Sequence, residues 1–367
     1  MIGIDAKYYD DIYIWLIVLL SLVVFIQYGN KKQSPFGTNK RNPFVGGFLL
    51  TLFLVFFIGL RPISGVFADM ISYYNLLWSL KGDVFNFEWN TDNILFDNYV
   101  SFLSSKIISV EFFFLSIASI YFVGIAWASS WLFPNDKMAA FLVYLGALST
   151  FSYSVNGIKA GAAASLFLVA IAMYEKRKWL WTVVFILLSL GFHHSMALSV
   201  VAFVVCLVVK NTKWFLWFWL FCFVIALLHV SFFQNLIGGL ADESGAMYLM
   251  GEGETVRRDV FGGFRIDFIL YSAVPIIFGC YGMMRKKQFS QKYLFLLNLY
   301  MLLNGVWMLC MYAEYTNRIA YLSWQLLPIV LIYPFLKEDW SGRQYRTFQY
   351  VAFGHLAFTL FMNYIYY

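Results

Sequence analysis

Two adjacent histidines, His193 and His194, lie inside one of the most apolar stretches of this 367-residue chain. The imidazole exchanges protons near neutral pH, which makes histidine a frequent general acid or base. Ionisable side chains inside a membrane-spanning stretch mark functional sites by default. We therefore predict proton transfer by His193 and a substrate contact by His194. The alternative is that the pair caps a helix end through hydrogen bonds to the backbone.

An arginine and an aspartate, Arg61 and Asp69, follow another apolar stretch. Pro62 and Gly65 lie between them and are typical turn residues. The turn would fold the Asp69 carboxylate back towards the Arg61 guanidinium, with Tyr73 one helical turn further on. We interpret Arg61 and Asp69 as catalytic and Tyr73 as substrate-binding. The alternative is an ion pair that only orients the loop.

Asn156 and Lys159 precede a run of small residues and are predicted to lie on one helix face, because they are three residues apart. A cation at the start of a helix opposes the helix dipole. It is better placed there if it holds an anion that the helix end also attracts. We predict that both residues bind substrate, and the alternative for Lys159 is snorkelling to the membrane surface.

Glu314 and Arg318 are four residues apart, with Tyr321 close behind them. If one helix continues through the first two, their side chains can form an ion pair. We predict that all three contact substrate, and a structural bridge between Glu314 and Arg318 is the alternative.

A glycine-rich segment, residues 234–264, contains Arg257 and Arg258 near its end, and Arg265 follows directly. Glycine at this density predicts a mobile loop. The segment is either a lid whose three arginines contact substrate or an unstructured connector.

The composition excludes an ordinary soluble domain, because 61% of the residues are hydrophobic, 13% are charged and the mean hydropathy is +0.70. A helical span needs about 20 apolar residues. We therefore predict an all-α, polytopic membrane protein whose residues 1–367 form a single transmembrane domain. About twelve spans fit this length, near residues 12–28, 44–60, 111–132, 138–155, 157–174, 179–192, 195–209, 213–233, 265–284, 291–313, 318–336 and 347–366.

Threading these spans in order places most of the 26 Lys and Arg residues in loops on one face. Cytoplasmic loops hold such an excess. Every loop on that face is basic, which favours an even number of spans with both termini outside. Arg61, Lys159 and Arg318 then lie on the outer face against this rule, as an outer site for an anionic ligand requires.

Two segments would shape the outer face. Residues 61–110 contain two amphipathic stretches, which we expect to form short helices in the membrane interface. Residues 179–209 are predicted to form a hairpin with Phe192–Ser195 at its apex, because both flanks are basic. Each arm reaches roughly 21 Å, whereas the hydrocarbon core is about 30 Å thick. The two histidines would then lie below the outer surface, in a water-filled cavity.

Several catalytic motifs are absent from the sequence. It contains no P-loop, no Rossmann glycine pattern, no His-Glu-x-x-His and no Gly-x-Ser-x-Gly. The four cysteines lie in predicted spans without metal-binding spacing. We expect no metal, no cofactor and no nucleic-acid partner, and we expect substrates to arrive already activated at the outer side or within the bilayer.

Four short patterns resemble those of the EpsG/Wzy family of bacterial polysaccharide polymerases, in their order along the chain and in their shared side of the membrane. They are Arg61…Gly65…Asp69…Tyr73, Asn156-x-Ile158-Lys159…Ala163, Phe192-His193-x-Ser195 and Arg318-x-x-Tyr321. Lys159-Ala160 departs from the Arg-Gln that is usual in the family, so the charge is kept without the bidentate geometry of arginine. The resemblance covers roughly residues 55–325.

This resemblance implies a reaction at the outer, periplasmic face of the bacterial inner membrane. Oligosaccharide repeat units carried on undecaprenyl pyrophosphate would serve as donor and acceptor, and a chain-length regulator is a further expected partner. We expect His193 to deprotonate the acceptor hydroxyl. Arg61, Lys159 and Arg318 would hold pyrophosphate or sugar hydroxyls, and Asp69 would orient Arg61 or a hydroxyl.

Three other functions remain open from the residues alone. One is another membrane glycan enzyme, either a ligase or a lipid-sugar glycosyltransferase. A flippase for a lipid-linked glycan is disfavoured, because the polar candidates concentrate at one side of the membrane. A membrane acyltransferase would also use an intramembrane histidine.

Overall fold

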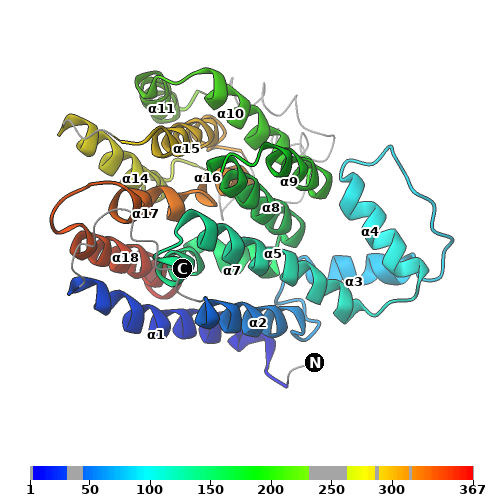
Figure 1. Ribbon diagram of the computed structural model, residues 1–367. Helices are drawn as coiled ribbons and strands as arrows, with labels where there is room; N and C mark the ends of the chain where they lie inside the picture. Colours follow the sequence, from blue (N-terminus) through cyan, green and yellow to red (C-terminus); the bar gives the residue numbers. More distant parts are fainter. Residues whose placement is uncertain (1–2, 31–43, 231–262, 286–288, 314–315, 367) are drawn as a thin grey trace. The chain divides into compact units, whose positions relative to one another are not determined.

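The computed structural model of the chain describes residues 3–30, 44–230, 263–285, 289–313 and 316–366 (Figure 1). Every regular element in these ranges is a helix, which confirms the predicted all-α class. Most of the glycine-rich segment lies outside the described residues, as do Arg257, Arg258 and Glu314. The lid and the contacts of these three residues therefore stay predictions.

The helices form two compact units. Unit 1 consists of Met1–Met196, Phe335–Lys337 and Ser341–Tyr367, and unit 2 consists of Ala197–Pro334 and Glu338–Trp340. The helices of unit 1 are α1 (Tyr9–Gly29), α2 (Val45–Gly59), α3 (Met70–Ser79), α4 (Ile94–Ser105), α5 (Val110–Leu132), α6 (Lys137–Leu145), α7 (Leu148–Val155), α8 (Ile158–Glu175), α9 (Trp179–Phe192) and α18 (Gln344–Phe361), with a 3-10 turn, η1 (Ala6–Tyr8), before α1 and a π-helical turn, η2 (Met362–Tyr366), after α18. Unit 2 contains α11 (Thr212–Leu227), α14 (Ile266–Met284), α15 (Gln291–Leu309), α16 (Asn317–Trp324) and most of α10 (Met196–Val208) and α17 (Leu327–Lys337).

Helix α8 forms the centre of unit 1 and packs against both α5 and α9. Residues 161–164 near its start are glycine and alanine and are all buried, which permits close helix approach. Ser165 Oγ donates to the Ile120 carbonyl of α5 at 3.1 Å, and Ser189 Oγ of α9 donates to the Ala163 carbonyl at 2.7 Å. These bonds place the start of α8 and the end of α9 at the same end of the unit.

The segment predicted as one span over residues 138–155 is instead bent. Helices α6 and α7 meet at 72° across Gly146 and Ala147. The bend leaves carbonyl groups without helical partners, and three hydroxyl groups donate to them: Tyr13 OH to Leu145 O at 2.8 Å, Thr359 Oγ1 to Gly146 O at 2.8 Å and Thr150 Oγ1 to Tyr144 O at 2.7 Å. A break inside an apolar interior is tolerated when its backbone groups are satisfied in this way.

Helices α1 and α18 pack side by side in opposite directions. At one end Tyr364 OH donates to Asp11 Oδ1 at 2.7 Å. At the other end the Tyr28 ring lies 5.9 Å from the Tyr345 ring, and Tyr28 OH donates to Asp136 Oδ1 at 2.7 Å. The segments before α1 and after α18 therefore lie at one end of unit 1.

Unit 2 has a buried polar centre that connects its helices. Trp219 Nε1 of α11 donates to Asn304 Oδ1 of α15 at 2.8 Å, and Asn304 Nδ2 donates to Ser323 Oγ of α16 at 3.1 Å. Tyr300 OH of α15 donates to the Ser272 carbonyl of α14 at 2.7 Å. Hydrogen bonds of this kind between apolar helices fix their relative positions.

The lengths and hydropathies of the described helices are those of a multi-pass membrane protein. Six helical segments are long and apolar enough to cross a bilayer, and the bent pair α6–α7 would make a seventh. Four further apolar helices, α2, α9, α10 and α11, are shorter, and α18 is in neither group. The twelve predicted spans are therefore not confirmed.

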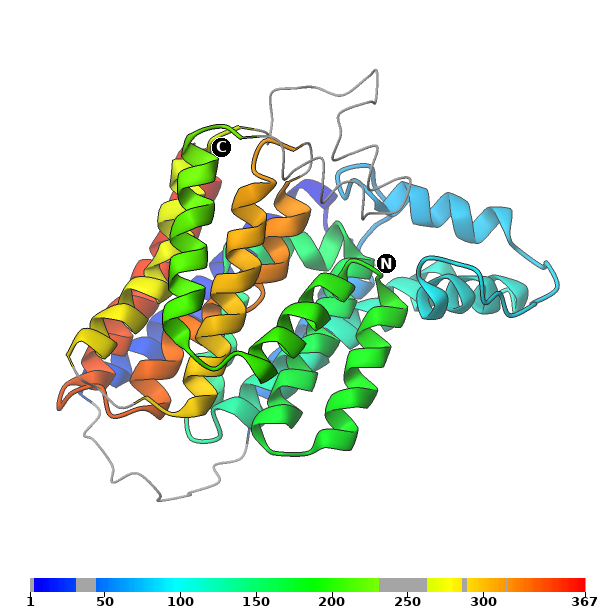
Figure 2. The same ribbon diagram turned by 90° about the horizontal axis from the view of Figure 1, so that it is seen from above.

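Helices α3 and α4 extend away from the long helices of unit 1 (Figures 1 and 2). The chain between them is anchored by Asn98, which is buried. Its Oδ1 accepts from the Glu88 N–H at 2.8 Å, and its Nδ2 donates to the Glu88 carbonyl at 2.7 Å. This pair of bonds fastens the connecting loop to α4, so the segment 61–110 is a folded part of unit 1.

Candidate functional site

Two predicted site residues of unit 1, Lys159 and Tyr73, lie beside the ring of Phe96, a buried residue in the first turn of α4. Lys159 Nζ lies 5.5 Å from the centre of this ring. The Tyr73 ring of α3 lies 5.6 Å away, and the ring of Phe192, which precedes His193, lies 6.3 Å away. Helices α3, α4, α8 and α9 therefore all contribute to one site.

His193 and His194 form the turn between α9 and α10, and both side chains are half-buried. Their rings are nearly perpendicular, with centres 5.0 Å apart. His193 Nδ1 lies 3.1 Å and His194 Nδ1 3.2 Å from the same atom, Asn93 Oδ1. The main-chain N–H of His194 also donates to this oxygen at 3.1 Å.

Asn93 is the main site residue that the sequence did not reveal. It is buried, with 5% of its surface exposed, and it precedes the first residue of α4. The only sequence signal is an asparagine in front of an amphipathic stretch, and such a residue normally predicts an N-cap. The contact with the histidines joins positions 100 residues apart, and no local pattern indicates it.

Asp69 is the residue before α3, and its carboxylate reaches across to the start of α8. Asp69 Oδ2 accepts from the Gly157 N–H at 2.9 Å. Gly157 has a φ of +56°, in the left-handed region that favours glycine. A carboxylate at the start of a helix is favoured by the helix dipole, so Asp69 both caps α8 and ties α3 to it.

Arg61 is enclosed by aromatic rings and by the ends of two helices. It is 2% exposed, and its guanidinium lies 5.1 Å from the Phe67 ring and 4.9 Å from the Phe114 ring. It donates to the carbonyls of Ile58 at 2.7 Å and Val155 at 3.3 Å, which belong to the last turns of α2 and α7. A cation at the C-terminal ends of two helices is favourable.

The predicted contact between Arg61 and Asp69 is not formed in the described part of the chain. Arg61 instead donates to the Ile58 carbonyl, and Asp69 accepts from the Gly157 N–H. Burial lowers the pKa of Arg61 to about 10, and nearby Tyr9 opposes this shift. The guanidinium therefore remains charged at neutral pH. This burial points to positioning of α2 and α7, and a direct contact with substrate would require the surroundings of Arg61 to open.

Asn156 and Lys159 do not share a helix face, which corrects the expectation from their spacing. Asn156 ends α7 with an extended backbone, and α8 begins at Ile158. Lys159 lies in the first turn of α8 and is half-buried. Asn156 Oδ1 is buried without a hydrogen-bond partner among the described residues. Lys159 and the start of α8 thus lie beside Phe96, in the turn of α4 that directly follows Asn93.

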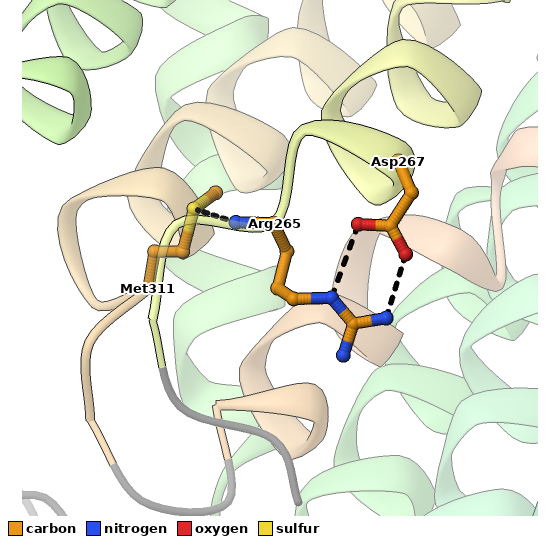
Figure 3. Close-up of polar contacts among 3 residues, drawn as sticks. All are labelled: Arg265, Asp267 and Met311. Atoms are coloured by element: carbon orange, nitrogen blue, oxygen red, sulfur yellow. Dashed lines mark hydrogen bonds and ion pairs between the residues drawn. The ribbon is translucent and has the colours of Figure 1, made fainter. Parts of the chain in front are cut away.

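In unit 2, Arg265 pairs with a carboxylate that the sequence did not single out (Figure 3). Arg265 Nε donates to Asp267 Oδ1 at 3.0 Å and Nη2 to Asp267 Oδ2 at 2.6 Å, a bidentate pair in which both side chains are mostly buried. The main-chain N–H of Arg265 lies 3.4 Å from Met311 Sδ. Arg265 therefore anchors the start of α14.

Arg318 and Tyr321 both lie on α16. Arg318 is exposed in the first turn of the helix, and the Tyr321 ring lies 5.6 Å from the Trp324 ring. Helix α15 ends at Leu309 and α16 begins at Asn317. Glu314 lies outside the described residues, so its pairing with Arg318 stays a prediction.

The site in unit 1 combines proton-transfer groups with a cation and a carboxylate. Two imidazoles can accept a proton from a hydroxyl group. Lys159, at a helix start, can neutralise an anion such as a phosphate. In the described part of the chain, no group of three or more His, Cys, Asp or Glu side chains is arranged to hold a metal ion.

Residues 45–367 match the family model described as the EpsG family. Searches of curated proteins and of solved structures gave no match.

Proposed function

Because the chain belongs to the EpsG family, a family of polysaccharide-related membrane enzymes, we propose that it is a polysaccharide polymerase. It would join oligosaccharide repeat units carried on undecaprenyl pyrophosphate at the periplasmic face of the inner membrane. The growing chain would pass from its lipid carrier to a hydroxyl group of the next unit, without a nucleotide sugar.

The observation that carries this proposal is the pair of imidazoles at the end of a short apolar helix. Helix α9 has 14 residues, which is roughly 21 Å, against about 30 Å for the hydrocarbon core. A polar turn at that depth requires a water-filled cavity, because lipid cannot satisfy its backbone. Such a cavity would admit a lipid-linked sugar from the bilayer and release a glycan to the water.

The chemistry of the proposed step is a substitution at the anomeric carbon of the donor. The acceptor hydroxyl oxygen attacks this carbon, and the bond to the pyrophosphate oxygen breaks. Its electron pair leaves with the lipid pyrophosphate. The hydroxyl proton passes to Nε2 of His193, which acts as general base and later returns the proton to solvent.

Lys159 is the proposed contact for the leaving group. Negative charge grows on the pyrophosphate as its bond to the sugar breaks, and a fixed cation stabilises that charge. The start of α8 adds the positive end of a helix dipole, part of which the Asp69 carboxylate already offsets. Asp69 and Arg61 act indirectly, by holding the ends of α8, α2 and α7.

The test is a polymerisation assay with purified protein in lipid nanodiscs and a lipid-linked repeat unit, resolved by gel. We expect a ladder of products together with release of undecaprenyl pyrophosphate. His193→Ala should lower the rate by ~10²–10⁴-fold, the usual contribution of a general base. His229→Ala is the matched control, because His229 stacks on Tyr312 in unit 2.

Three results would contradict the proposal. A well-folded wild-type protein that adds a single unit would be a ligase or transferase, and one that forms an acyl product would be an acyltransferase. A long ladder made by His193→Ala at the wild-type rate would remove His193 from the mechanism.

A further inference from the structure

We propose that Asn93 is a positioning residue that holds both histidines as the Nδ1–H tautomer. Each ring would then present the lone pair of Nε2, which is the base that sugar activation requires. The catalytic consequence depends on the polymerase function proposed above, whereas the tautomer itself is a property of the protein alone.

The identity of the Asn93 atom that faces the histidines follows from a main-chain group. The N–H of His194 can only donate, and it lies 3.1 Å from the Asn93 side chain. The atom that it meets must therefore accept, so it is the carboxamide oxygen and the amide nitrogen points away.

The tautomers follow from that oxygen. A neutral imidazole has one N–H and one nitrogen with a lone pair. An unprotonated Nδ1 at 3.1 or 3.2 Å from Asn93 Oδ1 would set two lone pairs against each other. A protonated Nδ1 donates a hydrogen bond instead. Three hydrogens then share the two lone pairs of this oxygen, which agrees with the long distances of 3.1, 3.1 and 3.2 Å. Hydrogen on Nδ1 is therefore favoured in both rings, and the lone pair of each ring is then on Nε2.

The position of Asn93 in α4 shows that its side chain serves the histidines. An asparagine before a helix normally accepts from the first N–H groups, which stabilises the helix by about 1 kcal/mol. Asn93 makes no such side-chain cap. Its own N–H donates to Asp97 Oδ2 at 3.2 Å, while its carboxamide oxygen is directed to α9.

The surroundings strengthen this arrangement. Asn93 is 5% exposed, so water competes little for its oxygen, and hydrogen bonds are stronger in such a medium. Close packing fixes its distance to the histidines: a methyl group added at Gly191 of α9 would lie 2.5 Å from Leu95 Cγ of α4. The first turn of α4 is therefore seated directly against the last turn of α9.

The experiment uses protein labelled with nitrogen-15 and carbon-13 histidine in lipid nanodiscs. The chain has only four histidines, so single substitutions of each assign the spectrum. Ring nitrogen shifts distinguish an N–H from a nitrogen with a lone pair. We expect His193 and His194 of the wild type to carry hydrogen on Nδ1.

Two substitutions of Asn93 distinguish the effect of losing the hydrogen-bond acceptor from the effect of a change in packing. Asn93→Leu keeps the shape and removes the acceptor, so the rings should change towards the Nε2–H form that predominates in unconstrained histidine. The polymerisation rate should fall by at least tenfold. Asn93→Asp keeps an oxygen acceptor and should preserve Nδ1–H on both rings together with measurable activity.

Asn98→Leu is the matched control. Asn98 is equally buried on α4, but its side chain binds Glu88 and Ile94 and not the histidines. It should leave both tautomers unchanged even where it lowers thermal stability.

Unchanged Nδ1–H signals in Asn93→Leu would overturn the inference, as would Nε2–H signals in the wild type. Failure of the polymerase function is a separate result. If the wild type makes no ladder but its histidines change tautomer in Asn93→Leu, then the proposed function is wrong and the positioning role stands.

Discussion

Replacement of Gly191 by alanine should separate α4 from α9 and inactivate the histidine pair. The added methyl group would lie 2.5 Å from Leu95 Cγ, 2.6 Å from Leu95 Cδ1 and 3.1 Å from Leu95 Cβ. Rotation of the leucine side chain cannot remove the last contact. Since carbon atoms pack at about 3.5–4.0 Å, the two helices must move apart by up to roughly 1 Å.

This movement has different effects on activity and stability. A shift of roughly 1 Å would take Asn93 Oδ1 beyond hydrogen-bond distance of both rings, because these bonds already span 3.1 and 3.2 Å. A misplacement of that size can lower a rate by about 10²-fold. Overpacking costs about 1–3 kcal/mol, and the helix preference of alanine over glycine offsets about 1 kcal/mol of it.

The assay measures the polymerisation rate, the melting temperature and the histidine tautomers of the same preparation. Gly191→Ala should lose most activity with a small change in melting temperature. The double substitution Gly191→Ala, Leu95→Ala restores the space and should recover activity. Gly279→Ala is the control, because its methyl group would meet Leu297 Cδ2 at 2.6 Å in unit 2. Full activity of Gly191→Ala at normal yield would refute the reasoning.

Two further substitutions test the cation and the bend. Lys159→Met keeps the aliphatic stem but removes the charge, and it should lower kcat by about 10²-fold, whereas Lys159→Arg should retain most activity. The control is Lys81→Met, at an exposed lysine over Trp78. A fully active Lys159→Met protein would exclude this leaving-group role. Thr359→Val removes the hydroxyl that donates to the Gly146 carbonyl. It should lower the free energy of unfolding by about 1–3 kcal/mol, measured by thermal melting. An unchanged melting temperature would show that another group satisfies this carbonyl.

Local patterns predicted the helices but not their interruptions. Long apolar runs identified α1, α5, α8 and α14 close to their observed bounds, and the turn at Phe192–Ser195 falls between α9 and α10 as expected. The bend at Gly146 was missed because the sequence there stays apolar. Two of the three hydroxyl groups that satisfy it come from Tyr13 and Thr359, which are far away along the chain.

In the candidate site, too, local sequence reveals individual residues but not their tertiary contacts. Asp69, Lys159 and the two histidines could be singled out because ionisable residues in apolar surroundings are conspicuous, and their roles stay predictions. Arg61 could be singled out in the same way, but its carbonyl partners depend on where α2 and α7 end, which hydropathy does not determine. Asn93 is uncharged and resembles an ordinary helix cap, so only its tertiary contact reveals it.

Asp69 and Asn93 immediately precede α3 and α4, yet both side chains bind residues at the ends of other helices. The segment 61–110 is therefore not a module that can be exchanged on its own. A chimera that received this segment from a relative would misplace its carboxylate and amide unless the matching ends of α8 and α9 came with it. We expect these three stretches to covary among relatives and to be inherited together when acceptor specificity changes.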